Sequence, residues 1–289
     1  MSSLKIYNKP FELKDMKEIK ESKVAQELKE LVDELTRENL VTTAMGNLSQ
    51  TNLTEILKYE FTLNPEKLWS YVRIVEFCQI KPRMRVLDGG GGLSPLVFYL
   101  GKKGVEIFVL DLQKDLIENT KKVAKKKGWG NIKAIQGDIA QIPFPENYFD
   151  VVYSISVLQN LPHKIKTKAV KEMARVLKPG GILGLVFDFG KSVKKREKYF
   201  SKKYDFFHFP LANVKEIEKY IILPSGLEIL GNKEFSEKIE VDKNFIRKTY
   251  LSNLKRKKNF FKILALPYLF FFSKYFSFTC YSLFLKKPK

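Results

Sequence analysis

The sequence predicts an α/β fold: a doubly wound, seven-stranded, mostly parallel sheet with a helical extension at its N-terminus. Between residues 84 and 189, short apolar runs typical of strands alternate with helical segments over short connections. Such alternation implies right-handed crossovers and helices on both faces of a parallel sheet. The composition, 44% apolar and 29% charged, is that of a globular chain, and 289 residues allow one large domain or two small ones.

The N-terminal part is expected to be helical. Apolar residues recur at three- to five-residue steps over residues 11–38, which predicts an amphipathic helix, broken near Glu21 and Ser22. A second helix is expected to open at Asn64-Pro65-Glu66, because Asn can cap a helix and Pro fits the first turn. We therefore separate an N-terminal helical lid or extension, residues 1–62, from a main domain, residues 63–289. The extension carries no motif with evident chemistry.

Five strands are expected in the alternating part, and two more follow it. Most of the five are nearly all apolar, as in strands buried on both faces. The expected strands are 84–88, 105–111, 131–138, 148–156 and 180–189, and the helices between them are 95–102, 112–127 and 164–177. Beyond Gly190, residues 226–235 and 276–287 are expected to form strands. The last is largely apolar, so we expect it to be inserted between two neighbours.

A run of four glycines, Gly89 to Gly92, follows the first expected strand, and Ser94-Pro95 caps the helix after it. Glycines let the backbone approach a ligand closely and adopt positive φ, at the edge where open α/β sheets bind ligands. By itself the run is equally compatible with a tight turn that packs a helix on a strand.

Acidic residues end or follow three successive strands. Asp88 ends the first strand, Asp111 ends the second, and Asp138 follows the third. These positions converge on one crevice, where Asp111 is suited to accept hydrogen bonds from ribose hydroxyls and Asp138 to receive an adenine amino group. Asp88 beside the glycines disfavours a phosphate-bearing cofactor. The set predicts a site for a ligand that carries positive charge and a ribose.

Four segments carry a resemblance to a known family. They are VLDGGGGLSP, FVLD, QGDIAQIPFPENYFDVVYSISVLQNLPH and VLKPGGIL. In this order and spacing they resemble the motifs of class I S-adenosylmethionine-dependent methyltransferases, most closely the small-molecule group that includes the ubiquinone and menaquinone methyltransferases. The resemblance covers about residues 84–186. It implies a Rossmann-like seven-stranded sheet whose last two strands form a reversed pair.

Carried over position by position, the resemblance assigns the methionine side of the cofactor. Asp88, Gly90 and Gly92 would lie along the methionine part, and Ser154 would contact its end through the backbone. Gly89 is counted with these residues, although Gly89 and Gly91 occupy positions that vary in the family and are expected to matter for conformation. The family usually has a third glycine where this chain has Ser94. Because Ser is small and caps a helix, we expect the loop to be retained.

The same comparison assigns the nucleoside side. Asp111 would hold the ribose, with Leu112 against the adenine, while Asp138 and Ile139 would fix the base. The implied cofactor is S-adenosyl-L-methionine, the product is S-adenosyl-L-homocysteine, and no metal is expected.

Methyl transfer requires mainly in-line positioning, with a base where the acceptor holds a proton. The candidate bases are His163, His208, Asp188 and Tyr153. His163 follows the loop after the fourth strand and is also compatible with a helix cap or a surface position. His208 lies in an aromatic stretch that would either line the acceptor pocket or pack in the core.

Missing motifs narrow the acceptor. No Asn-Pro-Pro-aromatic, Asp-Pro-Pro-aromatic or Pro-Cys motif follows the fourth strand, nor do paired glutamates, and Ser154 stands where catechol-type enzymes bind metal. We therefore expect a small-molecule or lipid-linked acceptor. Two alternatives remain: an RNA methyltransferase, and a methyltransferase-fold partner subunit that does not catalyse. The sequence leaves a homodimer possible.

The chain carries a net charge of +20, and residues 191–289 contain 23 basic but only 9 acidic residues. Within an insertion at 243–274, the basic run 255–258 precedes the aromatic and aliphatic stretch 260–272, a pattern typical of an interfacial membrane anchor or of a buried core or dimer segment. Only two cysteines and two histidines occur. We expect a cytoplasmic protein. The sequence leaves open whether it associates with an anionic membrane surface, and it disfavours binding to nucleic acid.

Overall fold

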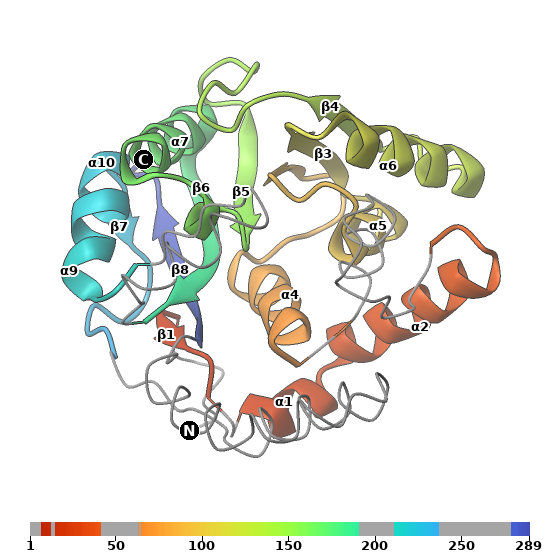
Figure 1. The fold of residues 1–289 in the computed structure, drawn as a ribbon, viewed down its shortest axis with the longest axis horizontal. Coiled ribbons are helices and arrows are strands. Elements are labelled where there is room, and N and C mark those ends of the chain that lie inside the picture. The colour runs from red at the N-terminus through yellow and green to blue at the C-terminus, as the bar shows by residue number, and fades with distance from the viewer. Residues whose placement is uncertain (1–6, 13–14, 42–62, 64, 191–210, 237–278) are drawn as a thin grey trace, which may run out of the picture.

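The computed structural model describes residues 7–12, 15–41, 63, 65–190, 211–236 and 279–289, and a mixed sheet forms its centre (Figure 1). The strands are β1 (Lys9–Pro10), β2 (Arg85–Gly89), β3 (Glu106–Asp111), β4 (Ile132–Gln136), β5 (Phe149–Ile155), β6 (Leu177–Phe189), β7 (Glu228–Ile229) and β8 (Thr279–Lys286). Their order is β1-β8-β6-β5-β2-β3-β4, and β7 also pairs with β8. Strands β2 to β6 are parallel, whereas β8 is antiparallel to its neighbours. The predicted fold class is confirmed.

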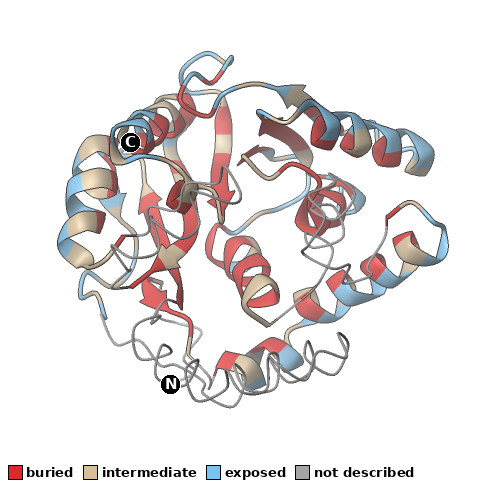
Figure 2. Ribbon diagram, in the orientation of Figure 1, coloured by how far each residue is buried: buried red, intermediate tan, exposed pale blue. Residues whose placement is uncertain are grey.

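Helices cover both faces of this sheet. One layer contains α1 (Asp15–Glu21), α2 (Lys23–Arg37), α4 (Pro65–Phe77), α5 (Pro95–Lys102) and α6 (Lys114–Lys127). The other contains α7 (His163–Val176), α9 (Val214–Ile217), the single π-helical turn η3 (Glu218–Ile222) and α10 (Leu223–Ser225). Figure 2 shows the strands mostly buried, and the helices buried where they face them. The two helical layers therefore enclose one core on each face.

The strands are apolar on both faces because both faces are covered. In β2, Val86 packs in the core under α4 and α5, whereas the next residue, Leu87, packs in the core under α7. In β8, Phe284 and Leu283 divide between the two cores in the same way. Successive side chains of a strand point to opposite faces. A strand covered on both sides therefore needs a continuous apolar run, which made these segments recognisable in the sequence.

The N-terminal segment contributes a strand as well as helices. The expected break in its helix is present, because Ser22 caps α2 and its hydroxyl accepts a hydrogen bond from the backbone of Ala25. Strand β1 was not predicted. It pairs Lys9 and Pro10 with the outer edge of β8, and the Arg73 guanidinium of α4 donates to the Tyr7 carbonyl just before it. The described extension is thus bound to the sheet at one end and to α4 and α5 along its helices.

The last two strands form the expected reversed arrangement. Strand β8 lies between β6 on one side and β1 and β7 on the other, which confirms the predicted insertion between neighbours. Strand β7 spans only Glu228–Ile229, so the predicted strand at 226–235 was too long. The insertion at 243–274 lies outside the described residues. Within the part that is described, no helix is both long and apolar enough to cross a bilayer.

Candidate functional site

The glycine loop is shaped by two different constraints. Gly90 and Gly92 have φ of +89° and +50°, a region that favours glycine. Gly89 and Gly91 lack positive φ, but space limits them: a Cβ at Gly89 would lie 2.7 Å from Ile139 Cδ1, and one at Gly91 would overlap the Asp88 carboxylate. The conformational role expected for Gly89 and Gly91 is therefore a steric one in this structure.

The acidic residues lie around this loop. Asp88 is buried at the end of β2. Asp111 is 8% exposed at the end of β3, and its carboxylate accepts a 2.8 Å hydrogen bond from the backbone of Gln113. A Cβ at Gly92 would lie 3.1 Å from Asp111 Oδ2. The acid expected to hold the ribose is therefore in direct contact with the glycine loop.

The adenine side of the site is more open. Leu112, next to Asp111, is 62% exposed, a high value for a large apolar side chain. Asp138 is exposed and accepts a 2.8 Å hydrogen bond from the backbone of Ala140, while Ile139 is buried against Gly89. An exposed apolar residue beside a carboxylate is a suitable surface for a planar base.

Strand β5 supports the loop from the other side. Ser154 is buried, and its hydroxyl donates a 2.7 Å hydrogen bond to the Gly89 carbonyl. Three residues further on, Val157 lies where a Cβ at Gly90 would be only 2.6 Å away. The expected backbone contact of Ser154 with the cofactor stays a prediction, whereas its side chain positions the glycine loop. On the helix side, Ser94 caps α5 as expected.

The candidate bases have different surroundings. Tyr153 is buried, and burial followed by the charge of Asp88 raises the pKa of its hydroxyl well above the ordinary value. It is therefore protonated at neutral pH and poorly suited to accept a proton. His163 begins α7 and stacks on Tyr220 of η3, with ring centroids 4.2 Å apart. His208 lies outside the described residues.

Two further charged residues, Glu66 and Lys67, for which the sequence predicted no chemical role, lie on the α4 side of this edge near the candidate base Asp188. The Lys67 Nζ is 3.3 Å from the Ser156 hydroxyl, just past β5. Glu66 precedes Lys67 in the first turn of α4. Burial, followed by the charge of Asp188 near the end of β6, raises the pKa of the Glu66 carboxyl group. Helix α4 contains no known motif. The only signal in the sequence for a role of Glu66 and Lys67 is that two charged residues stand together at the start of a helix.

The glycine loop and its acids fit S-adenosylmethionine. The fit rests on a loop where a Cβ at any of its four glycines would collide with a neighbour, on an acid in contact with that loop, and on an exposed leucine beside it. Among the described residues, no group of three or more His, Cys, Asp or Glu side chains is placed to hold a metal ion.

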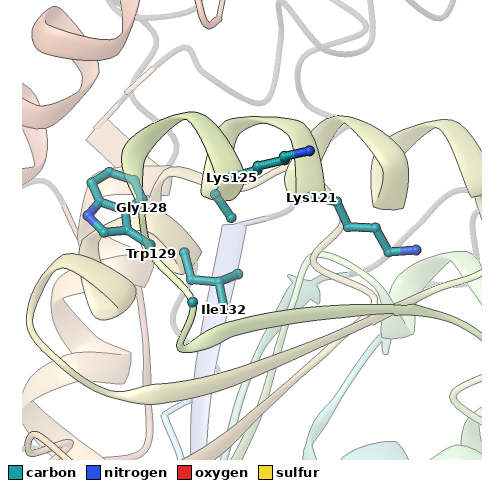
Figure 3. Close-up of a pocket in the computed structure, with 7 residues that line it drawn as sticks. Lys121, Lys125, Gly128, Trp129 and Ile132 are labelled. Carbon is teal, nitrogen blue, oxygen red and sulfur yellow. The ribbon is translucent and has the colours of Figure 1, made fainter.

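A hollow lies elsewhere in the described part of the chain. Figure 3 shows it at the turn from α6 to β4, lined by Lys121, Lys125, Gly128, Trp129 and Ile132. This turn precedes β4, so it belongs to the amino edge of the parallel strands, whereas the glycine loop belongs to the carboxyl edge. The hollow is separate from the candidate site.

Comparison with known proteins identifies related methyltransferases. Residues 87–185 match the family described as "Methyltransferase domain". The ubiquinone/menaquinone biosynthesis C-methyltransferase UbiE of Ectopseudomonas mendocina is 32% identical over 192 residues, which cover 64% of this chain and 73% of that enzyme. UbiE of Pseudomonas putida (strain W619) is also 32% identical, with the same coverage.

Solved structures share the fold. Phosphoethanolamine N-methyltransferase 2 of Haemonchus contortus, in complex with S-adenosyl-L-methionine, aligns with a TM-score of 0.61 and 16% identity over 84% of this chain and 59% of that one. The [4+2]-cyclase SpnF aligns with a TM-score of 0.57 and 17% identity over 78% and 84%.

The fold and the carboxyl-edge site define a Rossmann-like methyltransferase. With the identity to the UbiE enzymes, the chain belongs to the class I S-adenosylmethionine-dependent methyltransferases.

Proposed function

We propose that this methyltransferase methylates a small-molecule or lipid-linked acceptor, and that the acceptor is a quinol-type ring methylated at carbon. The observation that carries this proposal is the 32% identity to enzymes named as ubiquinone/menaquinone biosynthesis C-methyltransferases, extending over 73% of their length. The fold alone would not be enough, because SpnF shares it and is a cyclase.

The proposed cofactor contacts follow the geometry of the carboxyl edge. Asp111 would accept hydrogen bonds from the ribose, Leu112 would cover the adenine, and Asp138 with Ile139 would define its edge. The methionine part would lie along the loop that begins at Asp88, with Gly89, Gly90 and Gly92 leaving room for it and Ser154 fixing the loop from behind. When bound, S-adenosylmethionine supplies a methyl group on a positively charged sulfur, and in-line displacement yields S-adenosylhomocysteine.

A methyl-transfer assay tests the acceptor. The full chain is incubated with S-adenosylmethionine and a chemically reduced short-chain prenyl naphthoquinol that lacks the ring methyl group. We expect mass spectrometry to show one methyl group added to a ring carbon. A matched naphthoquinol that already carries this methyl group should gain none. No methylation of the first compound would contradict the proposed acceptor class.

The RNA alternative is tested separately. A methyltransferase that acts on RNA would bind it with an affinity that falls steeply with salt. We expect no RNA binding at physiological ionic strength and no transfer of labelled methyl to total RNA.

A further inference from the structure

The start of helix α4 lies at the carboxyl edge of the sheet, beside the proposed cofactor loop. A Cβ at Gly184 of β6 would lie 2.8 Å from Ile74 Cδ1 and 2.5 Å from Cys78 Sγ, so the end of α4 covers the middle of β6. Arg73, next to Ile74, places its Nε 3.1 Å from the Ser282 hydroxyl of β8, opposite Val186 of β6. The helix therefore runs back across these strands, and its first turn reaches the end of β6.

Asp188 faces this first turn. Side chains alternate along a strand, so Asp188 shares a face with Gly184, the face that α4 covers. In the sheet register it lies opposite Cys280 of β8. Glu66 and Asp188 both act on the buried Cys280, and their charges add to the effect of burial in raising the pKa of its thiol. Glu66, Asp188 and Cys280 thus gather at one point of the edge.

This group borders the glycine loop through β5. Lys67, next to Glu66, reaches the Ser156 hydroxyl at 3.3 Å. Ser156 follows by two residues the Ser154 that holds the Gly89 carbonyl, and Val157 contacts the position of Gly90. The first turn of α4, which carries Glu66, is therefore connected to the glycine loop through the end of β5.

The surroundings of Glu66 favour the protonated form. Burial raises the pKa of its carboxyl group, the charge of Asp188 raises it further, and Lys67 opposes both. The fourth group, the Cys280 thiol, stays protonated and adds no charge. A carboxylate whose pKa is raised toward the working pH is a more effective general base than an ordinary one.

We propose that Glu66 accepts the proton of the methyl acceptor, with Asp188 and Lys67 as the residues that set its basicity and position. This deepens the function proposed above, on which it rests for the kind of acceptor. As the bond between the acceptor carbon and the methyl group forms, the bond between methyl and sulfur breaks, its electron pair stays on sulfur and the positive charge there is lost. The proton of the quinol hydroxyl passes to a Glu66 Oε. The methylated ring carbon still carries its hydrogen, and its loss as a proton, with return of a proton to the oxygen, restores the aromatic quinol.

The first experiment needs no acceptor. The carboxyl groups of full-length protein labelled with ¹³C-glutamate are titrated by NMR, with Glu66 assigned from E66Q. We expect Glu66 to titrate above an ordinary glutamate, to move down in D188N and up in K67M, and to be unchanged in E118Q, a control on the exposed face of α6. Titration at the ordinary value, or no response to D188N, would overturn the proposal.

The second experiment measures turnover of the prenyl naphthoquinol described above. General base catalysis contributes about 10²–10⁴-fold, so we expect E66Q to lower kcat at least ~100-fold while calorimetry shows unchanged binding of S-adenosylhomocysteine. E66D should recover part of kcat. D188N should shift the acidic limb of the kcat/KM profile to lower pH, because Glu66 then loses its proton at a lower pH.

The two failures are distinguishable. Wild-type kcat in E66Q would overturn the role of Glu66 while leaving the acceptor class intact. A wild-type enzyme that leaves the naphthoquinol unmethylated would overturn the acceptor class, and the NMR titration would still decide whether the Glu66 and Asp188 pair exists.

Discussion

The Asp111 carboxylate is held in place by the backbone of Gln113, two residues further along the chain. A hydrogen-bond acceptor fixed in this way loses little freedom when a ribose binds. Hydrogen bonds to a charged group contribute about 1.5–3 kcal/mol. We therefore predict that Asp111→Ala weakens binding of S-adenosylmethionine about 10- to 150-fold by calorimetry.

Asp115→Ala is the control for this prediction, because Asp115 is an exposed acid in the first turn of α6. It should bind the cofactor like the wild type. Unchanged affinity in Asp111→Ala would remove the ribose assignment.

A substitution at Gly91 tests whether lack of space requires glycine at this position of the loop. A methyl group there would overlap the Asp88 carboxylate, so the loop or the acid must move. Overpacking of this kind costs typically ~1–3 kcal/mol, and we predict such a loss in the free energy of unfolding for Gly91→Ala, together with weaker binding of S-adenosylhomocysteine. Gly130→Ala is the matched control, because nothing lies within 4 Å of a Cβ there. Equal stability of the two variants would contradict this reading.

At the scale of elements, helix α2 is fastened to α5 and α6 by ion pairs. Glu34 contacts Lys102 of α5 and Lys127 of α6. The hydrogen bond from Lys102, followed by that from Lys127, lowers the pKa of Glu34 to about 2. The contribution of a carboxyl group with a lowered pKa is present above its unfolded value, near 4.5, and is lost as the pH falls through the folded value.

We therefore predict that α2 loosens between about pH 4.5 and 2. The protection factors of the α2 amides, which correct for the intrinsic pH dependence of exchange, should fall over this range in the wild type. In Glu34→Gln the protection factors should already be lower at pH 7 and should change less on acidification. Glu118→Gln, which removes an ion pair within α6, should behave as the wild type. Identical pH profiles for Glu34→Gln and wild type would refute the role of these ion pairs.

The sequence predicted some strands and site residues more closely than others. Strands β2, β3, β5 and β6 were predicted within a few residues because burial on both faces requires continuous apolar runs. Strand β1 was missed, since two residues that include Pro10 carry no strand pattern and pair only because the edge of β8 is available. The tight packing of Gly89 was not predicted because it depends on Ile139, which is distant in sequence, and that of Gly91 was not predicted because it depends on how the folded loop turns toward the Asp88 carboxylate. Glu66 was missed for a related reason, since only the fold brings it to Asp188.

At the scale of the whole molecule, residues 191–289 carry a surplus of positive charge. The role of this surplus in binding a membrane stays a prediction from the sequence. If the basic run 255–258 meets anionic lipid, each basic residue contributes about 1 kcal/mol. We predict that the protein sediments with vesicles containing anionic lipid, that salt weakens this binding, and that changing Lys255, Arg256, Lys257 and Lys258 to Glu abolishes it. Neutral vesicles are the control. No sedimentation at low salt would instead favour a core or dimer role for this segment.

The position of β8 also sets the order in which the fold can be completed. Lys9 pairs with Ser282, so β1 cannot join the sheet until nearly the whole described chain has been synthesised. The parallel strands β2 to β6 pair only with one another on their inner edges and all precede residue 190, so they can assemble earlier. During that interval the outer edge of β6 stays uncovered, and exposed strand edges are sites of aggregation. A nascent chain stalled before residue 279 should therefore be the species that most needs a chaperone.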